Sequence, residues 1–384
     1  MRFEFATATR IVFGPGILSD VGKLARPWGH RALVVTGKNP ARAARLLELL
    51  SQDGISVSVF PVDGEPSVSL VVEGVEAARR QHAEMIIGFG GGSAIDAAKA
   101  IAGLVTNPGH PLDFLEVVGQ GRPLTQVALP WMAIPTTSGT GAEVTRNAVL
   151  FVSEHRVKVS LRSPFLLAQI ALVDPELTLD LPPALTASTG LDALTQLIEA
   201  YVSVKANPLT DGLCTSALPK IARSLPEAWR TPSSLAARVD LSFASLASGL
   251  ALANAGLGAV HGFAAAIGGM FEAPHGAICG ALLAPVMTAN LRALQSRLPD
   301  SSALPRYEEI ARWLTANASA HASDGVAWVQ ARVVEFQLPR LRHYGVKAAD
   351  AADIVARTQN ASSTKGNPVG LTAGELTAAL LEAI

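Results

Sequence analysis

The first half of the chain alternates between two hydrophobic periodicities. Residues 41–54 and 69–82 repeat apolar side chains at helical spacing, and short β-branched runs around them favour strands. These strand-like runs are RALVVTG (31–37), ISVSVF (55–60), AEMIIGFGGGS (83–93), VALPWMAIPTT (127–137) and IALVDPEL (170–177). Strands that alternate with helices are typical of a parallel, doubly wound sheet, so we predict an α/β domain here.

From Pro182 onward the pattern changes to long segments rich in Ala and Leu, separated by Pro, Gly and Ser. This spacing predicts helices and no further sheet. We therefore predict an α/β dinucleotide-binding domain over residues 1–184 and an all-helical metal-binding and catalytic domain over residues 185–384.

The most apolar stretch of the chain, residues 241–269, is interrupted by Ser242, Ser245, Asn254 and His261. A membrane helix needs about 20 predominantly apolar residues, so this pattern indicates a pair of buried helices instead. The first residues, MRFEFATATRIVFGPG, have no cationic segment followed by an apolar run, so we expect no signal peptide.

Composition narrows the class of function. The 384 residues include 31 basic and 32 acidic side chains, and this balance argues against nucleic acid or an anionic membrane as a partner. Small-molecule chemistry is therefore the favoured class. The two cysteines, Cys214 and Cys279, are too few for a disulfide framework, and we expect a cytoplasmic protein.

A glycine loop, FGGGS, lies between the run at 83–93 and the next helical segment. Its backbone amides can approach a phosphate, which a helix N-terminus also favours, or the glycines can form an ordinary tight turn. Asp96 and Lys99 follow in the helix, where they bind a ligand or act as a capping carboxylate and a solvated lysine. The residues that we predict to contact a dinucleotide here are Gly90, Gly91, Gly92, Ser93 and Asp96.

A second polar loop, IPTTSGTGAEVTRNAVL (134–150), follows the next strand-like run. Its hydroxyls can bind phosphates or the nicotinamide amide, or they can form ordinary Ser/Thr turns. The cofactor candidates in this loop are Thr136, Thr137, Ser138 and Thr140.

Residues 191–203, LDALTQLIEAYVS, place Asp192 and Gln196 one helical turn apart on one face, as in a metal-binding pair. Gln196 is an amide, where a divalent transition metal usually prefers an imidazole or a carboxylate. His261 and His275 would lie about 21 Å apart on a single helix, too far to share an ion. A helix that starts after Pro274 removes this difficulty, because two helices can then direct both imidazoles at Asp192.

Each histidine, taken alone, is compatible with an ordinary core residue. Together with Asp192, the two histidines supply three ligands, the number that leaves a catalytic metal an open position. We interpret Cys279 as a small core residue and Glu199 as a polar contact inside the helical domain.

Long motifs in one order make the chain resemble the iron-containing (group III) alcohol dehydrogenase family. The resemblance runs almost end to end, through FATATRIVFGPGIL, GGGSAIDAAKA, PTTSGTGAEVT, KVSLRSPFLLAQIALVDPEL, GLDALTQLIEAYVS, HGFAAAIGG, PHGAICGALLAP and NPVGLT. It implies the dehydroquinate synthase-like fold: an N-terminal nucleotide-binding α/β domain with a parallel sheet, an all-α C-terminal domain and a cleft between them.

The resemblance implies that Asp192, Gln196, His261 and His275 hold the metal, with Asp192, His261 and His275 as the catalytic set. Gln196 departs from the family pattern, which has a histidine there. Its amide oxygen then supplies a weak fourth ligand or leaves that position to water. Ala265 is a second departure, since many members place a histidine thought to help proton transfer there.

The resemblance also places Gly90 to Ser93 at the pyrophosphate and the threonine-rich loop at the nicotinamide. It places Lys158 near the ribose of the nicotinamide half, with a surface charge as the alternative. NAD-preferring members end the strand at 31–37 with an acidic residue, but this chain has Gly37 followed by Lys38. We therefore favour NADP over NAD, with Lys38 as a plain solvated lysine the alternative.

These features predict a metal-dependent oxidoreductase that transfers a hydride between NAD(P)H and an aldehyde, ketone or alcohol, with Fe²⁺ or Zn²⁺ as the metal. A maleylacetate reductase-like or glycerol dehydrogenase-like enzyme is the alternative within the superfamily. A nucleotide-binding sensor or scaffold with a decayed metal site is the alternative from another class. The family resemblance suggests a homodimer.

Overall fold

The chain forms two units in the computed structural model, which describes residues 2–384. The α/β unit comprises Thr7–Thr137 and Gly141–Thr178. The helical unit comprises Ser138–Thr140 and Leu179–Ile384 together with residues 2–6. A domain boundary after residue 184 stays a prediction, since the two units interleave along the chain.

Side-chain hydrogen bonds explain why two short segments belong to the helical unit. Asn254 accepts from the N–H of Ala6 at 2.7 Å and donates to its carbonyl at 3.0 Å. The hydroxyls of Ser138 and Ser242 lie 3.1 Å apart. The threonine-rich loop is therefore divided, with Thr137 in the α/β unit and Ser138 in the helical unit.

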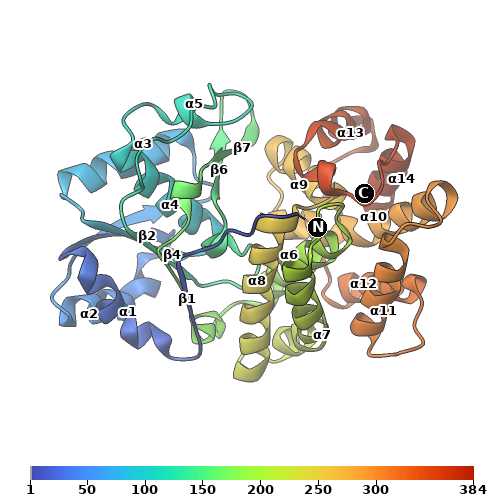
Figure 1. The fold of residues 1–384 in the computed structure, drawn as a ribbon, viewed down its shortest axis with the longest axis horizontal. Coiled ribbons are helices and arrows are strands. Elements are labelled where there is room, and N and C mark those ends of the chain that lie inside the picture. The colour runs from blue at the N-terminus through green and yellow to red at the C-terminus, as the bar shows by residue number, and fades with distance from the viewer. Residues whose placement is uncertain (1) are drawn as a thin grey trace. The chain divides into compact units, whose positions relative to one another are not determined.

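The α/β unit is built on a parallel sheet of six strands in the order β1-β8-β5-β4-β2-β3. Figure 1 labels three of these strands, β1, β2 and β4. These strands are β1 (Arg10–Phe13), β2 (Arg31–Gly37), β3 (Ser56–Val62), β4 (Met85–Gly90), β5 (Trp131–Pro135) and β8 (Ile170–Val173). β4 is buried along its whole length, as expected for a parallel strand covered on both faces. β2 has the predicted bounds.

Helices connect these strands in the predicted alternation. They are α1 (Val21–Ala25), α2 (Ala44–Gln52), α3 (Val68–Arg80), α4 (Gly92–Thr106) and α5 (Pro111–Phe114). Short 3₁₀ helices complete the unit: η1 (Ile17–Asp20), η2 (Arg26–Trp28), η3 (Pro40–Ala43), η4 (Ala142–Val144), η5 (Pro164–Leu166) and η6 (Pro175–Thr178).

Three strand features differ from the sequence prediction. The end of the predicted polar loop is strand β6 (Asn147–Val152), which pairs antiparallel with β7 (Val157–Arg162) in a separate hairpin. The run at 170–177 is a strand only as far as Val173, because η6 begins at Pro175. The edge strand β1 has four residues, too few for a periodic signal.

The helical unit packs around one large apolar core. Its helices are α6 (Pro183–Val202), α7 (Pro208–Arg230), α8 (Leu235–Ala255), α9 (Ala259–Met270), α10 (His275–Arg297), α11 (Ala303–Thr315), α12 (Ala322–Glu335), α13 (Ala351–Asn360) and α14 (Ala373–Ala383). Three 3₁₀ helices lie among them: η7 (Leu341–Tyr344), η8 (Ala348–Asp350) and η9 (Ser363–Gly366).

α8 and α10 are long and apolar enough to cross a membrane by length and composition. In the structure, 67% and 78% of their most apolar windows are buried. α8 and α9 together form the pair of buried helices predicted over residues 241–269.

Candidate metal centre and cofactor loops

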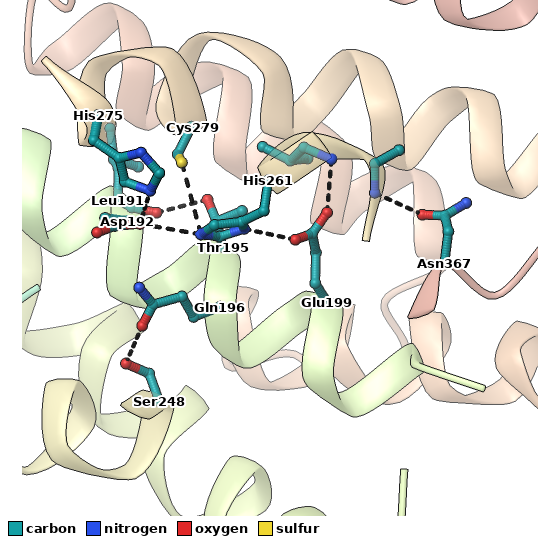
Figure 2. A network of polar contacts seen from close by, with 12 residues as sticks. Leu191, Asp192, Thr195, Gln196, Glu199, Ser248, His261, His275, Cys279 and Asn367 are labelled. Carbon is teal, nitrogen blue, oxygen red and sulfur yellow. Dashed lines mark hydrogen bonds and ion pairs between the residues drawn. The ribbon is translucent and has the colours of Figure 1, made fainter. Parts of the chain in front are cut away.

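Three helices of the helical unit bring four potential metal ligands together (Figure 2). α6 carries Asp192, α9 carries His261, and α10 carries His275 and Cys279. One ligand atom from each residue lies within 4.8 Å of the others. Oδ1 of Asp192 is 3.3 Å from Nε2 of His261 and 3.6 Å from Nε2 of His275.

These separations fit a single cation. Ligands about 2.0–2.3 Å from an ion at tetrahedral corners are themselves about 3.3–3.8 Å apart. Oδ1 of Asp192 is buried and makes no hydrogen bond within the described residues, although both imidazole nitrogens face it. A buried carboxylate oxygen without a partner is costly unless positive charge stabilises it.

The start of α10 brings His275 into the cluster. Pro274 occupies the N-cap position and His275 is the first helical residue, which confirms the predicted break between the two histidines. The ring centroids of His261 and His275 consequently lie 5.4 Å apart.

Two glycines let α10 approach α6 closely. A Cβ at Gly276 would overlap the carbonyl oxygen of Ser188, and a Cβ at Gly280 would lie 2.8 Å from Cδ1 of Leu191. Gly276 and Gly280 are one turn apart on the same face of α10. Their missing side chains therefore set the distance between Asp192 and the ligands on α10.

The cluster attracts positive charge. Burial opposes ionisation of Asp192, but the charge of His275 and the contact with His261 outweigh it and hold the pKa of Asp192 below its ordinary value. Burial also opposes protonation of His275, yet Cys279 and Asp192 raise its pKa to about 9. The pKa of His261 is raised for similar reasons, against the effect of burial. The positive charge that stabilises Asp192 can come from protons on His261 and His275 or from a bound metal cation.

Glu199 orients the imidazole of His261. Its Oε2 accepts from Nδ1 of His261 at 2.7 Å, and its Oε1 accepts from the N–H of Val260 at 2.7 Å. With the proton on Nδ1, the lone pair on Nε2 is free for a metal. A Cβ at Gly258 would lie 2.7 Å from Oε1, so glycine makes room for the carboxylate. The predicted polar contact of Glu199 is confirmed.

Gln196 lies beside the cluster, but its amide oxygen points to Ser248 (Figure 2). The Ser248 hydroxyl donates to Oε1 at 2.6 Å, and Nε2 donates to the carbonyl of Thr140 at 3.4 Å. Turning the amide over would place Oε1 against the Thr140 carbonyl, where two acceptors repel each other. Ser248, which the sequence analysis did not single out, therefore holds the amide.

Cys279 is buried, as expected for a core residue, but its sulfur also belongs to the ligand cluster. Its Sγ lies 3.9 Å from Nε2 of His261. The sequence signal for this placement is that Cys279 follows His275 by one helical turn. Spacing alone does not reveal it, because packing sets the rotation of α10 about its axis.

The predicted phosphate loop joins β4 to α4 in the α/β unit. Gly91 is the N-cap residue of α4, and no side chain caps the helix. The amides of Gly92 and Ser93 are therefore open to an anion at a helix N-terminus. A Cβ at Gly90 would lie 2.7 Å from Cβ of Ala94, so the turn requires glycine.

Asp96 and Lys99 face the interior of the α/β unit. Asp96 accepts an N–H from β6 at 3.1 Å, and it lies in the second turn of α4, beyond a capping position. The fully buried Lys99 donates to the carbonyls of Ala142 and Asn147 and to the hydroxyl of Thr145. The alternatives of a capping carboxylate and a solvated lysine are therefore wrong. Lys99 instead fixes the C-terminal end of the threonine-rich loop through these three hydrogen bonds.

Two lysines assigned to the cofactor have acidic partners. Nζ of Lys38 lies 2.9 Å from Asp63, with both side chains largely exposed. Nζ of Lys158 donates to Glu65 at 2.9 Å, and its side chain is only 13% exposed. Lys158 is thus mostly shielded from solvent, whereas Lys38 is solvent-exposed, and the cofactor role of both lysines stays a prediction. Asp63 and Glu65 lie just after β3.

Two family models match the chain and together span both units. The model for iron-containing alcohol dehydrogenase matches residues 8–175, and the C-terminal model of the Fe-containing alcohol dehydrogenase family matches residues 186–384. The chain belongs to the iron-containing alcohol dehydrogenase family. Among solved structures, that of a 1,3-propanediol oxidoreductase superposes with a TM-score of 0.92 at 32% identity, over all of both chains.

Characterised relatives support the same family. Alcohol dehydrogenase 4 of Saccharomyces cerevisiae (strain YJM789) is 34% identical over 381 residues, which cover 97% of this chain and 96% of the yeast protein. The 1,3-propanediol dehydrogenase of Klebsiella pneumoniae is 35% identical over 378 residues, which cover 95% and 96%. Sulfoacetaldehyde reductase from Bifidobacterium kashiwanohense, solved in complex with NAD⁺, has a TM-score of 0.88 at 28% identity over 100% of this chain and 99% of that one.

These similarities confirm the predicted fold class and activity. The protein is a metal-dependent alcohol dehydrogenase that acts on an alcohol or aldehyde with a nicotinamide cofactor. The maleylacetate reductase-like and glycerol dehydrogenase-like alternatives, and the sensor or scaffold with a decayed metal site, are not favoured.

Proposed function

We propose that the helical unit binds one catalytic divalent cation through Asp192, His261 and His275, for the reversible, NADP(H)-dependent reduction of aldehydes or ketones to alcohols. The observation that carries this proposal is the buried Oδ1 of Asp192, which lacks a hydrogen bond and faces two imidazole nitrogens. When bound, the cation supplies Lewis acidity towards the substrate oxygen, and the nicotinamide carries the hydride.

The protein residues divide the work of building this site. Asp192 contributes the negative charge, and His261 presents Nε2 in the orientation that Glu199 imposes. The side chain of His275 is 37% exposed, compared with 3% for Asp192, so His275 lies on the accessible side of the cluster. Because Ser248 binds the amide oxygen of Gln196, the fourth coordination position of the metal is left to water or to another donor.

The histidine that many family members place at the position of Ala265, where it is thought to help proton transfer, is absent from this chain. Ala265 is exposed on α9, one turn after His261, and carries no titratable group. The proton must travel by water, a ribose hydroxyl of the cofactor or another side chain. We therefore expect Ala265→His to speed turnover and make it less dependent on pH. Matching pH–rate profiles for the wild type and the variant would contradict this role.

The NADP preference rests on the end of β2. No acidic residue directly follows β2, because Gly37 precedes Lys38, and the nearby carboxylate of Asp63 is paired with Lys38. The pair between Lys38 and Asp63 is exposed and screened by solvent, so Lys38 can exchange Asp63 for a phosphate. KM for NADPH should be below that for NADH, and Lys38→Ala should raise only the KM for NADPH. A lower KM for NADH would contradict the assignment.

The dehydrogenase assignment is tested by elemental analysis of protein purified without chelator. A screen of the metal-loaded sample should follow, with NADH and NADPH and a panel of aldehydes and alcohols. The panel should include 1,3-propanediol, because several relatives are named for it. Protein that binds no metal and turns over no panel member would overturn the proposal.

We further propose that the protein is a cytoplasmic homodimer. Both of its cysteines are free and buried, which suits a reducing compartment, and the family resemblance suggests the dimer. Sedimentation velocity measures the assembly, and a monomer at micromolar concentration would contradict it.

A further inference from the structure

We propose that Cys279 is the fourth protein ligand of the metal, in the place that Gln196 leaves open. The site would then present two imidazole nitrogens, one carboxylate oxygen and one thiolate sulfur. This inference rests on the metal site proposed above and adds one residue to its ligand set.

The position of the sulfur carries the inference. Sγ of Cys279 lies 3.9 Å from Nε2 of His261, and it lies within 4.8 Å of a ligand atom of Asp192 and of His275. Figure 2 shows the thiol directed from α10 towards Asp192 and His261. A thiolate ligand lies about 2.3 Å from zinc and an imidazole nitrogen about 2.0–2.1 Å, so a separation of about 3.6 Å is expected at tetrahedral corners. The separation between Sγ and Nε2 of His261 is therefore only about 0.3 Å longer than this value.

The oxygen Oδ1 of Asp192, which also carries the proposed metal site, is the second observation. It is buried, it lacks a hydrogen bond, and it faces the same space as Sγ of Cys279. Without an ion, this space holds a carboxylate oxygen, a thiol and two imidazoles, and protons on the imidazoles are then needed to pair the carboxylate. A cation satisfies all four groups at once.

Gln196 does not compete for this position. Its oxygen, the only atom of the side chain that binds metals, is engaged by Ser248 on the side away from Asp192 (Figure 2). The Ser248 hydroxyl is fully buried, so the contact is protected from water. The helix turn of α6 that carries a histidine ligand in the family therefore supplies no ligand here.

The chemistry of this donor set differs from that of a carboxylate with three imidazoles. As the sulfur–metal bond forms, the thiol proton leaves to water, and the two anionic ligands balance the charge of the cation. Thiolate is a soft donor that favours Zn²⁺ over metals that prefer oxygen. We therefore expect the site to prefer Zn²⁺ to Fe²⁺ and to bind substrate by expanding its coordination number.

Substitution with Co²⁺ tests the sulfur directly. A Co²⁺–thiolate bond gives a strong near-ultraviolet charge-transfer absorption, which oxygen and nitrogen ligands do not give. The full-length protein loaded with one equivalent of Co²⁺ should show this absorption, and Cys279→Ser and Cys279→Ala should lose it. Both variants should also lose Zn²⁺ affinity by more than about 100-fold, the upper end of the effect of removing an orienting partner of a ligand.

Cys214 provides the matched control. It is the other cysteine of the chain and lies buried in α7, outside the ligand cluster. Cys214→Ser should keep the charge-transfer absorption and the wild-type Zn²⁺ affinity. Loss of the absorption in Cys279→Ser but not in Cys214→Ser supports the proposal.

The remaining outcomes separate this proposal from the metal site itself. If wild-type protein binds Co²⁺ with visible d–d absorption but without the thiolate band, Asp192 and the histidines still hold the metal and Cys279 does not. A thiolate band that persists in Cys279→Ser also overturns the assignment. If the wild type binds no Co²⁺ or Zn²⁺ at all, both the ligand and the proposed metal site are wrong.

Discussion

The carboxylate of Asp192 shows how a single buried side chain organises the site. Its Oδ1 faces the Nε2 atoms of His261 and His275 without a hydrogen bond. Each of the three residues comes from a different helix, so none of them has a local reason to meet the others. The buried carboxylate of Asp192 and the two imidazoles together form a site where a cation would be stabilised.

Changes at Asp192 and Gln196 should move metal affinity in opposite directions. Asp192→Ala removes the anionic ligand and should abolish binding, whereas Gln196→His adds an imidazole on the same helix and should tighten it. Metal titration followed by elemental analysis of dialysed protein measures both effects. The placement of the site is wrong if both variants bind like the wild type.

The orienting bond from Glu199 to His261 should also affect metal affinity. Glu199→Gln keeps the shape of the side chain but weakens the acceptor at Nδ1 of His261, so we expect metal affinity to fall by about 10–100-fold. Competition with a chelator measures this change.

Glu227→Gln, an exposed change on α7 of the same unit, is the control and should leave affinity unaltered. Equal affinities for Glu199→Gln and Glu227→Gln would show that the contact with His261 does not support metal binding.

At the scale of elements, the close contact between α6 and α10 decides whether the ligands meet. Gly276 and Gly280 bring the backbones of the two helices together next to Asp192 and His275. The N-terminus of α9 is held in a related way, because Glu199 and Asn367 accept the first amides of that helix. Small residues and buried acceptors thus position the three helices.

A methyl group at Gly276 should disturb both the helix contact and the metal site. In Gly276→Ala the new Cβ overlaps the carbonyl of Ser188, so α10 must move away from α6 at a cost of about 1–3 kcal/mol. We expect a lower unfolding midpoint in denaturant and weaker metal binding.

Gly212→Ala is the matched control for this change. Gly212 is exposed in α7, and a Cβ there meets no atom within 4 Å. Alanine should therefore stabilise this helix by up to about 1 kcal/mol without affecting the metal. A Gly276→Ala variant as stable as Gly212→Ala would refute the role of the helix contact.

For the molecule as a whole, buried charges in the α/β unit link stability to pH. Burial raises the pKa of Glu143 to about 7, although its own backbone N–H and Lys99 oppose the rise. The unfolded carboxyl loses its proton at its ordinary pKa of 4.5. Between these values the folded state binds more protons, so the free energy of unfolding falls as pH rises and levels off above pH 7.

Glu143→Gln should remove this loss of stability. The amide is neutral throughout, so the variant should gain up to about 3 kcal/mol relative to the wild type between pH 5 and pH 8. Urea unfolding at both pH values measures the difference, with the exposed change Glu73→Gln as the control. An equal pH dependence in the wild type and Glu143→Gln would mean that Glu143 is ionised in the folded protein.

The order of helices and strands could be predicted from the sequence, because local periodicity reflects which side chains face the interior. β2 has the predicted bounds, and α10 starts at His275 because Pro274 precedes it. The clustered residues Asp192, His261 and His275 could be named as candidate metal ligands from the resemblance to a family. The hairpin of β6 and β7 escaped prediction, because its first strand continues a polar loop.

The sequence by itself thus determined the two kinds of architecture and named three of the residues that the structure brings together in one cluster. Only the tertiary structure decided that Lys99 is buried, that Ser248 holds the amide of Gln196 and that Cys279 turns towards His261. The physical reason is that a local sequence pattern constrains only residues that are close together along the chain. Spacing along a helix fixes neighbours one turn away, but helix rotation and contacts between distant residues depend on packing across the whole unit.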